Sequence, residues 1–154
     1  MARANFQVLV LPFTQINGTL RFCVFTRADS PVKQFIAGGG ENNETPPEAA
    51  KREAFEEAGI ASDAVYYTLD TRCSIPASCF RPSDRAHWPV DCFVVTEHAF
   101  AVQVNDTFLS LSHEHGKYEW MDYTTAMQAL TYDSNKTALW ELCERLKCKM
   151  LFST

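Results

Sequence analysis

The sequence predicts an α/β (α+β) fold in which helices cover a β-sheet. Apolar runs typical of strands alternate along the chain with two or three segments that carry helical signals, and this alternation is typical of layered folds. The chain has 154 residues, of which 46% are hydrophobic and 21% are charged. That length and composition suit one domain with a proper core, so we expect a single domain over residues 1–154.

The first strands are predicted from apolar runs and from the turn residues between them. A continuous apolar run forms the first strand, and Pro12 within it indicates an edge or a bulge. The pair Asn17-Gly18 is a strong hairpin signal. The third strand is short and enters a glycine-rich loop. The strands predicted in this half span residues 6–13, 20–26 and 35–37.

The C-terminal half is predicted to hold further strands and two helices. Asp122 can cap the first of these helices, and the second has apolar residues at helical spacing. The predicted strands span residues 64–75 (one or two strands), 90–96 and 117–120, the helices span 123–130 and 134–147, and 77–87 is a loop.

The clearest element is a helix over residues 46–58. Thr45 is a good N-cap, and Glu48 lies three residues later, which makes a capping box. Two prolines occupy the first helical positions, where a missing N–H costs nothing. Gly59 is placed to end the helix in a left-handed turn. Alanines at every fourth position predict close packing of this helix on a sheet.

Carboxylates gather in the last two turns of this helix. Glu53 and Glu57 lie four residues apart and repel each other, and Glu56 adds a third negative charge near the helix C-terminus. One interpretation is a solvated face on which Arg52 pairs with Glu56. The other is that a divalent cation binds the glutamates, which suggests phosphate chemistry.

The spacing of these residues resembles the signature of the Nudix hydrolase family. The signature covers 23 residues, and the sequence matches it at every charged and glycine position. Ala54 departs from it, since the family usually has a larger aliphatic residue there. The resemblance implies an α/β/α sandwich around a mixed sheet, and cleavage of a diphosphate linkage with Mg²⁺ or Mn²⁺. The matching positions are Gly38, Glu44, Arg52, Glu53, Glu56, Glu57 and Gly59.

The resemblance and the preference of Mg²⁺ for oxygen ligands suggest roles for these residues. Arg52 would orient the glutamates through its guanidinium group. Glu44 would brace the adjoining loop or reach the metal through water. The candidate metal ligands are Glu53, Glu56, Glu57 and a backbone carbonyl at Gly38, and the candidate substrate contacts are Arg27, Glu44 and Gly39.

The general base is open between two glutamates. In the family it is either a glutamate of the motif helix, here Glu53, or a glutamate on a loop elsewhere, for which Glu114 is the candidate. His113 and His115 flank Glu114 and are an alternative metal site, although no third ligand is spaced to help them.

Charge and targeting signals restrict the partners. The formal net charge of −5 argues against a broad nucleic-acid-binding face. No apolar run of 18 residues and no signal peptide are visible. Six cysteines without a C-x-x-C pair indicate reduced, mostly buried thiols. We therefore expect a cytoplasmic enzyme for a small phosphorylated substrate, with a homodimer as an open option.

Three functions are consistent with the sequence. The first is a pyrophosphohydrolase of a nucleoside or pterin triphosphate, because the segments 118–122 and 134–138 are similar to bacterial Nudix enzymes for dATP or dihydroneopterin triphosphate. The second is hydrolysis of a nucleotide sugar, ADP-ribose or a dinucleoside polyphosphate. The third is a nucleotide sensor without catalysis. Three aromatic residues are candidates to stack on a base or pterin ring, namely Phe80, Trp88 and Tyr132.

Overall fold

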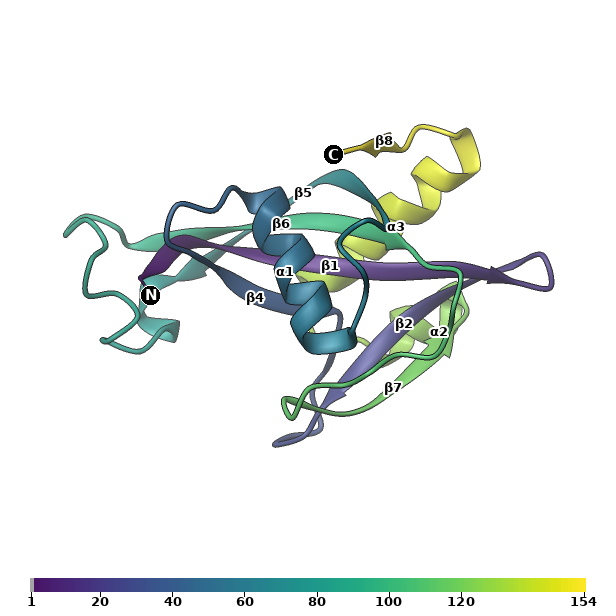
Figure 1. The fold of residues 1–154 in the computed structure, drawn as a ribbon, viewed down its shortest axis with the longest axis horizontal. Coiled ribbons are helices and arrows are strands. Elements are labelled where there is room, and N and C mark those ends of the chain that lie inside the picture. The colour runs from purple at the N-terminus through teal and green to yellow at the C-terminus, as the bar shows by residue number, and fades with distance from the viewer. Residues whose placement is uncertain (1) are drawn as a thin grey trace.

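The computed structural model describes residues 2–154, and these form one mixed eight-stranded sheet with helices on both faces (Figure 1). The strand order is β3-β2-β1-β6-β5-β8, with β4 paired to β1 and β7 paired to β2. The strands are β1 Arg3–Ile16, β2 Thr19–Arg27, β3 Lys33–Gln34, β4 Ile36–Glu41, β5 Val65–Pro76, β6 Val94–Gln103, β7 His115–Met121 and β8 Phe152–Ser153. The helices are α1 Pro46–Ala58, α2 Tyr123–Ala129 and α3 Asp133–Cys148, with a 3-10 turn at Ala77–Cys79.

Strand β1 runs through the middle of the sheet. It pairs in parallel with β6 and antiparallel with both β4 and β2. Pro12 therefore lies in an interior strand, and the prediction of an edge or bulge at this residue was wrong. Pairing with β4 ends at Val10 and pairing with β2 begins at Phe13. The proline falls where β1 changes its antiparallel partner, and a residue without an N–H is tolerated there.

The hairpin between β1 and β2 is confirmed. Ile16 pairs with Thr19 across a two-residue turn. Asn17 and Gly18 have φ values of 53° and 78°, and two positive φ angles are what a type I′ turn requires.

Helix α1 has the predicted bounds and caps. Thr45 and Glu48 form the capping box, and Gly59 ends the helix with φ 68° in the left-handed region. The alanines at every fourth position of α1, Ala50, Ala54 and Ala58, are buried. They pack on one face of the sheet, in a cluster with side chains such as Val8 and Val102. Small side chains let the helix axis lie close to the sheet. This packing distance sets the position of the α1 glutamates relative to the neighbouring strands.

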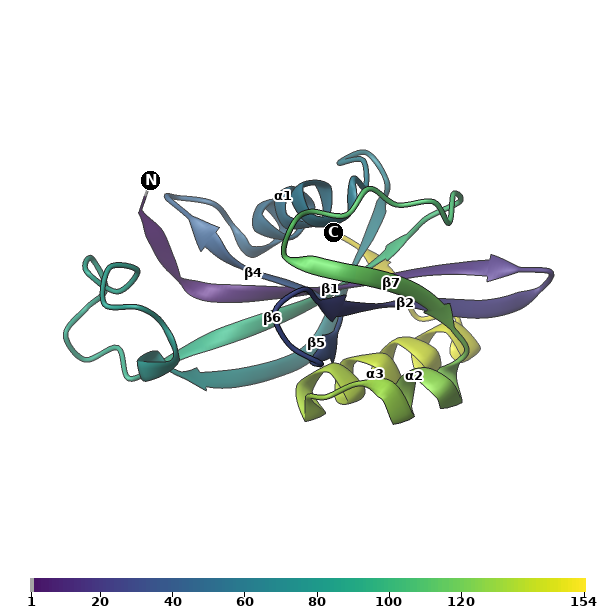
Figure 2. The ribbon, with the colours of Figure 1, turned by 90° about the horizontal axis from the view of Figure 1, so that it is seen from below.

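The opposite face of the sheet is covered by α2 and α3. Leu139 and Leu142 of α3 pack against Leu9 and Leu11 of β1, all of them fully buried. Figure 2 shows the sheet between α1 on one side and α2 with α3 on the other. The predicted α/β/α sandwich with a central mixed sheet is therefore confirmed.

Several local predictions need correction. Residues 38–40 belong to strand β4 and are not a loop, because glycines let this strand pass close under the side chains of Arg3 and Phe6. Strand β6 spans Val94–Gln103, not 90–96, because its polar residues Glu97 and His98 are internal to the strand. The two-residue strands β3 and β8 were not predicted.

The cysteines also differ from the prediction of mostly buried thiols. Only Cys23 and Cys143 are buried among the six, and all six are unpaired. None of the helices in residues 2–154 is long and apolar enough to cross a membrane.

Candidate functional site

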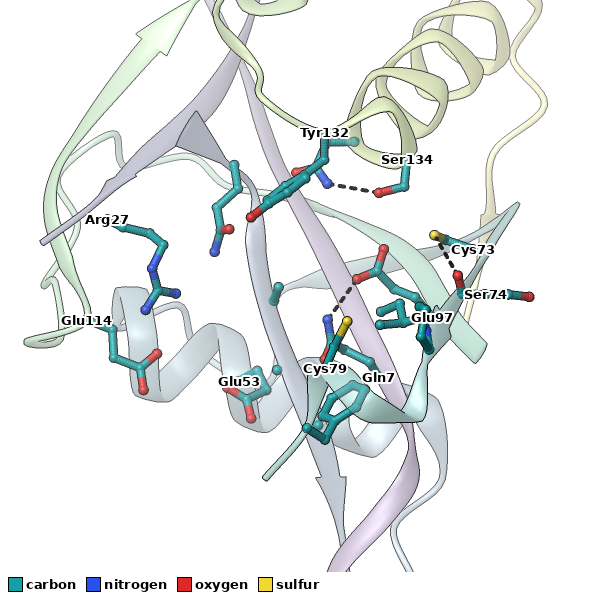
Figure 3. Close-up of a pocket in the computed structure, with 18 of the residues that line it drawn as sticks. Gln7, Arg27, Glu53, Cys73, Ser74, Cys79, Glu97, Glu114, Tyr132 and Ser134 are labelled. Atoms are coloured by element: carbon teal, nitrogen blue, oxygen red, sulfur yellow. Dashed lines mark hydrogen bonds between the residues drawn. The ribbon is translucent and has the colours of Figure 1, made fainter. Parts of the chain in front are cut away.

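A cavity of about 640 Å³ opens beside α1. Its walls come from α1, strands β1, β4, β5 and β6, and the segment that leads into α3. Figure 3 shows Arg27, Glu53 and Glu114 on one side of the cavity and Gln7, Cys73, Ser74 and Glu97 on the other. The cavity thus has two chemically distinct ends.

The first end is built on two buried glutamates of α1. Glu53 is 9% exposed and Glu57 is 4% exposed, and both line the cavity. Burial, together with the charge of Glu57, raises the pKa of Glu53 to about 8. Burial, together with the nearby carboxyl of Glu114, raises the pKa of Glu57 to about 9. These carboxyl groups need a proton or a bound cation to be stable near neutral pH.

Glycine is required at position 38, beside the carboxyl group of Glu53. A side-chain carbon at Gly38 would overlap the carboxyl group of Glu53. The glycine in β4 therefore leaves the space that this carboxyl occupies. The Gly38 backbone is therefore close to the Glu53 carboxyl group, as the absence of a side chain allows.

Arg52 organises the other side of α1. It donates to both carboxylate oxygens of Glu44 at 2.8 and 3.0 Å, to Glu53 at 2.9 Å, and to the Gly39 carbonyl at 2.8 Å. The hydrogen bonds with Glu44 raise the pKa of Arg52 and lower the pKa of Glu44. Arg52 is therefore a fixed cation that holds one oxygen of Glu53 and ties α1 to β4.

Glu44 braces this arrangement and does not contact the cavity. Its Oε1 accepts the backbone N–H of Glu41 at 2.7 Å, and it is absent from the cavity wall. The structure thus supports bracing, and it does not place Glu44 where a substrate contact was predicted. Gly39 lines the cavity, but its carbonyl is already used by Arg52.

Glu56 lies apart from the two buried glutamates. Its side chain is 53% exposed, and it accepts from Arg52 at 3.1 Å, as the solvated-face interpretation predicted. Within residues 2–154 no three Asp, Glu, His or Cys side chains are gathered closely enough to hold a metal ion. Glu53 and Glu57 offer hard oxygen ligands, and the positive charge around them is too small to keep both ionised near neutral pH. They therefore fit Mg²⁺ or Mn²⁺. Glu56 would have to leave Arg52 to join them.

His115 is a site residue whose contact the sequence did not predict. Its Nε2 lies 2.9 Å from Oε2 of Glu57, and its side chain is 1% exposed. Burial lowers the pKa of His115 and so favours the neutral ring. The tautomer of that ring and the protonation of Glu57 together set which of the two groups donates. His113 is exposed, and the two histidines do not form the metal pair considered above. The strand was expected to begin at Lys117, and this hid the inward orientation of residue 115.

Arg27 and Glu114 both line the cavity near Glu57. The backbone of Ala28 donates to the Glu114 carbonyl at 2.9 Å, which ties the end of β2 to the Glu114 loop. Arg27 is held by Asp29 at 2.8 and 3.0 Å. These two side chains, predicted from distant parts of the sequence, are brought together at the first end of the cavity.

The second end contains Glu97 and its neighbours, which sequence reasoning missed. Glu97 is 6% exposed, and its Oε2 accepts from the Gln7 side chain at 3.0 Å. Of the predicted stacking residues, Phe80 and Tyr132 line the cavity. Trp88 is absent from the cavity wall; it packs edge-on against Phe80 and donates to the Arg3 carbonyl at 2.8 Å.

Comparison with known proteins agrees with this architecture. The family model described as NUDIX domain matches residues 6–141. A solved NUDIX hydrolase from Listeria monocytogenes has a TM-score of 0.84 and 40% sequence identity, and the match covers 98% of this chain and all of that one. An Ap4A hydrolase from C. elegans has a TM-score of 0.73 with 16% identity over 94% of this chain and 99% of that one, which shows the fold alone.

Two further relatives match with different coverage. A dihydroneopterin triphosphate diphosphatase from Haemophilus influenzae is 28% identical over 137 residues, which are 88% of this chain and 85% of that protein. An octanoyltransferase from Myxococcus xanthus is 33% identical over 100 residues, or 64% of this chain. The match spans only 25% of the octanoyltransferase.

The family model covers most of the chain, including α1 and its glutamates, and the whole fold matches that of a NUDIX hydrolase. The chain therefore belongs to the Nudix hydrolase family, whose members act on phosphorus-containing anhydrides.

Proposed function

We propose that the protein is a divalent-metal-dependent pyrophosphohydrolase that converts a nucleoside or pterin triphosphate to the monophosphate and pyrophosphate. The observation that carries this proposal is the pair of buried carboxyl groups, Glu53 and Glu57, in the wall of a cavity. Two buried carboxylates with raised pKa values suit a site that receives a dication together with a polyphosphate. The Haemophilus influenzae relative, named as a dihydroneopterin triphosphate diphosphatase, supports a triphosphate substrate.

The metal would be held by Glu53, Glu57, the Gly38 carbonyl and Glu56. When bound, Mg²⁺ or Mn²⁺ neutralises phosphate oxygens and lowers the pKa of coordinated water. Arg52 keeps one Glu53 oxygen in place, and His115 does the same for Glu57. Such supporting contacts orient ligands and commonly contribute 10- to 100-fold to metal affinity or activity.

Arg27 and Glu114 are proposed to act on the substrate. The Arg27 guanidinium lies at the same end of the cavity as the glutamates and can bind a phosphate oxygen, since it is a planar multi-donor cation. Glu114 is exposed at that end and can accept the proton of the attacking water. Glu53 is the alternative base, because its raised pKa also favours proton uptake.

Two variants separate the candidate bases. We expect Glu114→Gln to lower kcat strongly with metal affinity intact if Glu114 is the base. If Glu53 is the base, Glu114→Gln retains most of the activity. Glu53→Gln loses turnover and metal binding in either case, because Glu53 is also a proposed metal ligand, so the Glu114 variant decides. Titration of Mg²⁺ against activity distinguishes the two results.

A substrate panel tests the proposed reaction. Nucleoside triphosphates, dihydroneopterin triphosphate, ADP-ribose and diadenosine polyphosphates would be incubated with Mg²⁺ at mildly alkaline pH, with pyrophosphate and monophosphates measured separately. Pyrophosphate from a triphosphate supports the proposal. Cleavage of only the bridged substrates would replace it with the second function, and binding without cleavage of any substrate would indicate a sensor. The intact set Arg52, Glu53, Glu56 and Glu57 argues against the sensor.

A further inference from the structure

The second end of the cavity presents a buried carboxyl group that the proposed hydrolysis does not use. Glu97 projects from β6 into the cavity, on the side away from Glu53 and Glu114 (Figure 3). It is 6% exposed, and no Arg, Lys or His within residues 2–154 forms an ion pair with it. A buried carboxyl without a cation is costly, so a group that the fold retains at this place calls for a ligand.

The acceptor capacity of Glu97 is only partly used. An ionised carboxylate can accept about four hydrogen bonds. The Gln7 amide fills one position on Oε2, and the Ser134 hydroxyl is a second hydrogen-bonding partner. Burial raises the pKa of Glu97, while Gln7 and the Ser134 hydroxyl hold that pKa down. In mildly alkaline solution, where such nucleotide reactions are assayed, more of the group is ionised and offers its remaining lone pairs to the cavity.

We propose that Glu97 selects the ring of the substrate by accepting two adjacent N–H groups from a 2-amino-4-oxopyrimidine edge, the edge that guanine and pterins share. The proposal rests on the proposed function, because it requires that the triphosphate end of the ligand lie at Glu53 and Glu57. The ring of the substrate then lies at the second end of the cavity, beside Glu97, while its triphosphate lies at the first end.

The same carboxylate disfavours other rings. Adenine and cytosine present an N–H₂ donor beside a ring nitrogen that is itself an acceptor, so one oxygen of Glu97 would face a lone pair. A site built to bond a particular donor rejects analogues that lack it, because its buried polar group is left unpaired. Glu97 therefore favours guanine and pterin rings over adenine.

The neighbouring side chains can hold a flat ring in this position. Phe80 and Tyr132 line the cavity, and Tyr132 leans over it on the α3 side (Figure 3). Arg3 lies 5.5 Å from the centre of the Phe80 ring, and Trp88 packs edge-on against that ring with centroids 5.5 Å apart. Trp88 supports Phe80 from outside the cavity, whereas Arg3 lies over the Phe80 ring and lines the cavity with it. A supported aromatic wall favours stacking of a heterocycle.

The test compares ring preference in the wild type and in Glu97→Gln. The values of kcat/KM would be measured for dihydroneopterin triphosphate, dGTP and dATP with Mg²⁺ at mildly alkaline pH. Glutamine keeps the shape but offers one acceptor and one donor, which suits adenine. We expect the preference for the guanine and pterin substrates over dATP to fall about 10- to 100-fold, as expected for a lost charge-assisted hydrogen bond. The control is Glu144→Gln, whose side chain is 44% exposed and, within residues 2–154, forms an ion pair only with Lys147.

Binding of the monophosphates of neopterin, guanosine and adenosine separates this inference from the proposed function. A Glu97-dependent preference in binding, without hydrolysis of any triphosphate, would support the ring assignment and refute the proposed reaction. Hydrolysis of triphosphates with an unchanged ring preference in Glu97→Gln would overturn the ring assignment alone. An equal loss for all three substrates, with an altered Mg²⁺ requirement, would also overturn it and would assign Glu97 to metal binding. The relative rates with dGTP and dihydroneopterin triphosphate tell which of the two rings is preferred.

Discussion

At the scale of single residues, the site depends on carboxyl groups whose burial is tolerated because partners surround them. Glu53 is held by Arg52 and seated over Gly38, and Glu57 is held by His115. Glu56 has the same chemistry but remains half-exposed on Arg52. The three glutamates of the motif therefore differ in burial and in partners, although they lie within five residues of one another in the sequence.

Glu57→Gln separates the chemical role of this residue from its structural one. We expect a fall in kcat/KM of at least about 100-fold, because a metal ligand worth several kcal/mol of transition-state stabilisation is lost. Folding should be retained or improved, since the mutation removes a buried ionisable group whose charged form is costly. Steady-state kinetics and thermal melting measure the two effects, with Glu144→Gln as the charge-matched control. Full activity of Glu57→Gln would show that Glu57 is not a metal ligand.

At the scale of elements, α1 was predicted accurately because its signals are local. The capping box at Thr45, the prolines at its start and Gly59 at its end act within a few residues of one another. The same applies to the Asn17-Gly18 turn. Long-range features were not predicted. Two such features are the contact of His115 with Glu57 and the position of Glu97. Both depend on where strands β6 and β7 begin and end, and the bounds predicted from the sequence differ from those in the structure by several residues.

Strand β6 shows why the second end of the cavity could not be predicted. Its segment Thr96-Glu97-His98 is polar, so the apolar run before it was interpreted as the strand. Pairing with β1 and β5 places these polar residues inside the sheet, with Glu97 opposite Gln7. A polar residue in the interior of a strand is expected where the sheet lines a functional cavity.

The cap of α1 provides a prediction at this scale. Thr45→Ala removes the side chain that accepts the Glu48 backbone N–H. We expect the free energy of unfolding to fall by about 1 kcal/mol, with kcat/KM for the preferred substrate nearly unchanged, because the opposite end of α1 carries the glutamates. Denaturant unfolding measures the first quantity. Thr45→Ser, which keeps a capping hydroxyl, serves as the control and should recover most of the stability. A loss in Thr45→Ser equal to that in Thr45→Ala would argue against the capping role.

At the scale of the whole molecule, the buried glutamates link stability to pH and to metal. The folded pKa values of about 8 for Glu53 and about 9 for Glu57 lie above the ordinary pKa of 4.5 for a glutamate. The folded state therefore binds more protons than the unfolded state between these limits. These two groups therefore lower the stability of the folded state as pH rises from about 4.5 to about 9, whereas His98 and His115, whose pKa values are lowered by burial, contribute in the opposite direction. The expected loss is on the order of a few kcal/mol for this coupled pair.

Mg²⁺ should counteract this loss, because a dication supplies the charge that the protons provided. Denaturant unfolding at several pH values, with EDTA or with Mg²⁺, measures the effect. We expect Mg²⁺ to stabilise the protein more at alkaline than at acidic pH, and Glu57→Gln to flatten the pH dependence measured in EDTA. An equal Mg²⁺ effect at all pH values would contradict the link between the metal and these glutamates.

The measurement that tests the central claim most directly is phosphorus NMR of the products formed from a triphosphate, with wild type and Glu57→Gln, in Mg²⁺ and in EDTA. The account predicts monophosphate and pyrophosphate from the wild type in Mg²⁺ alone, and turnover by Glu57→Gln that is at least about 100-fold slower. Release of orthophosphate, or turnover near the wild-type rate in EDTA or in the variant, would contradict it.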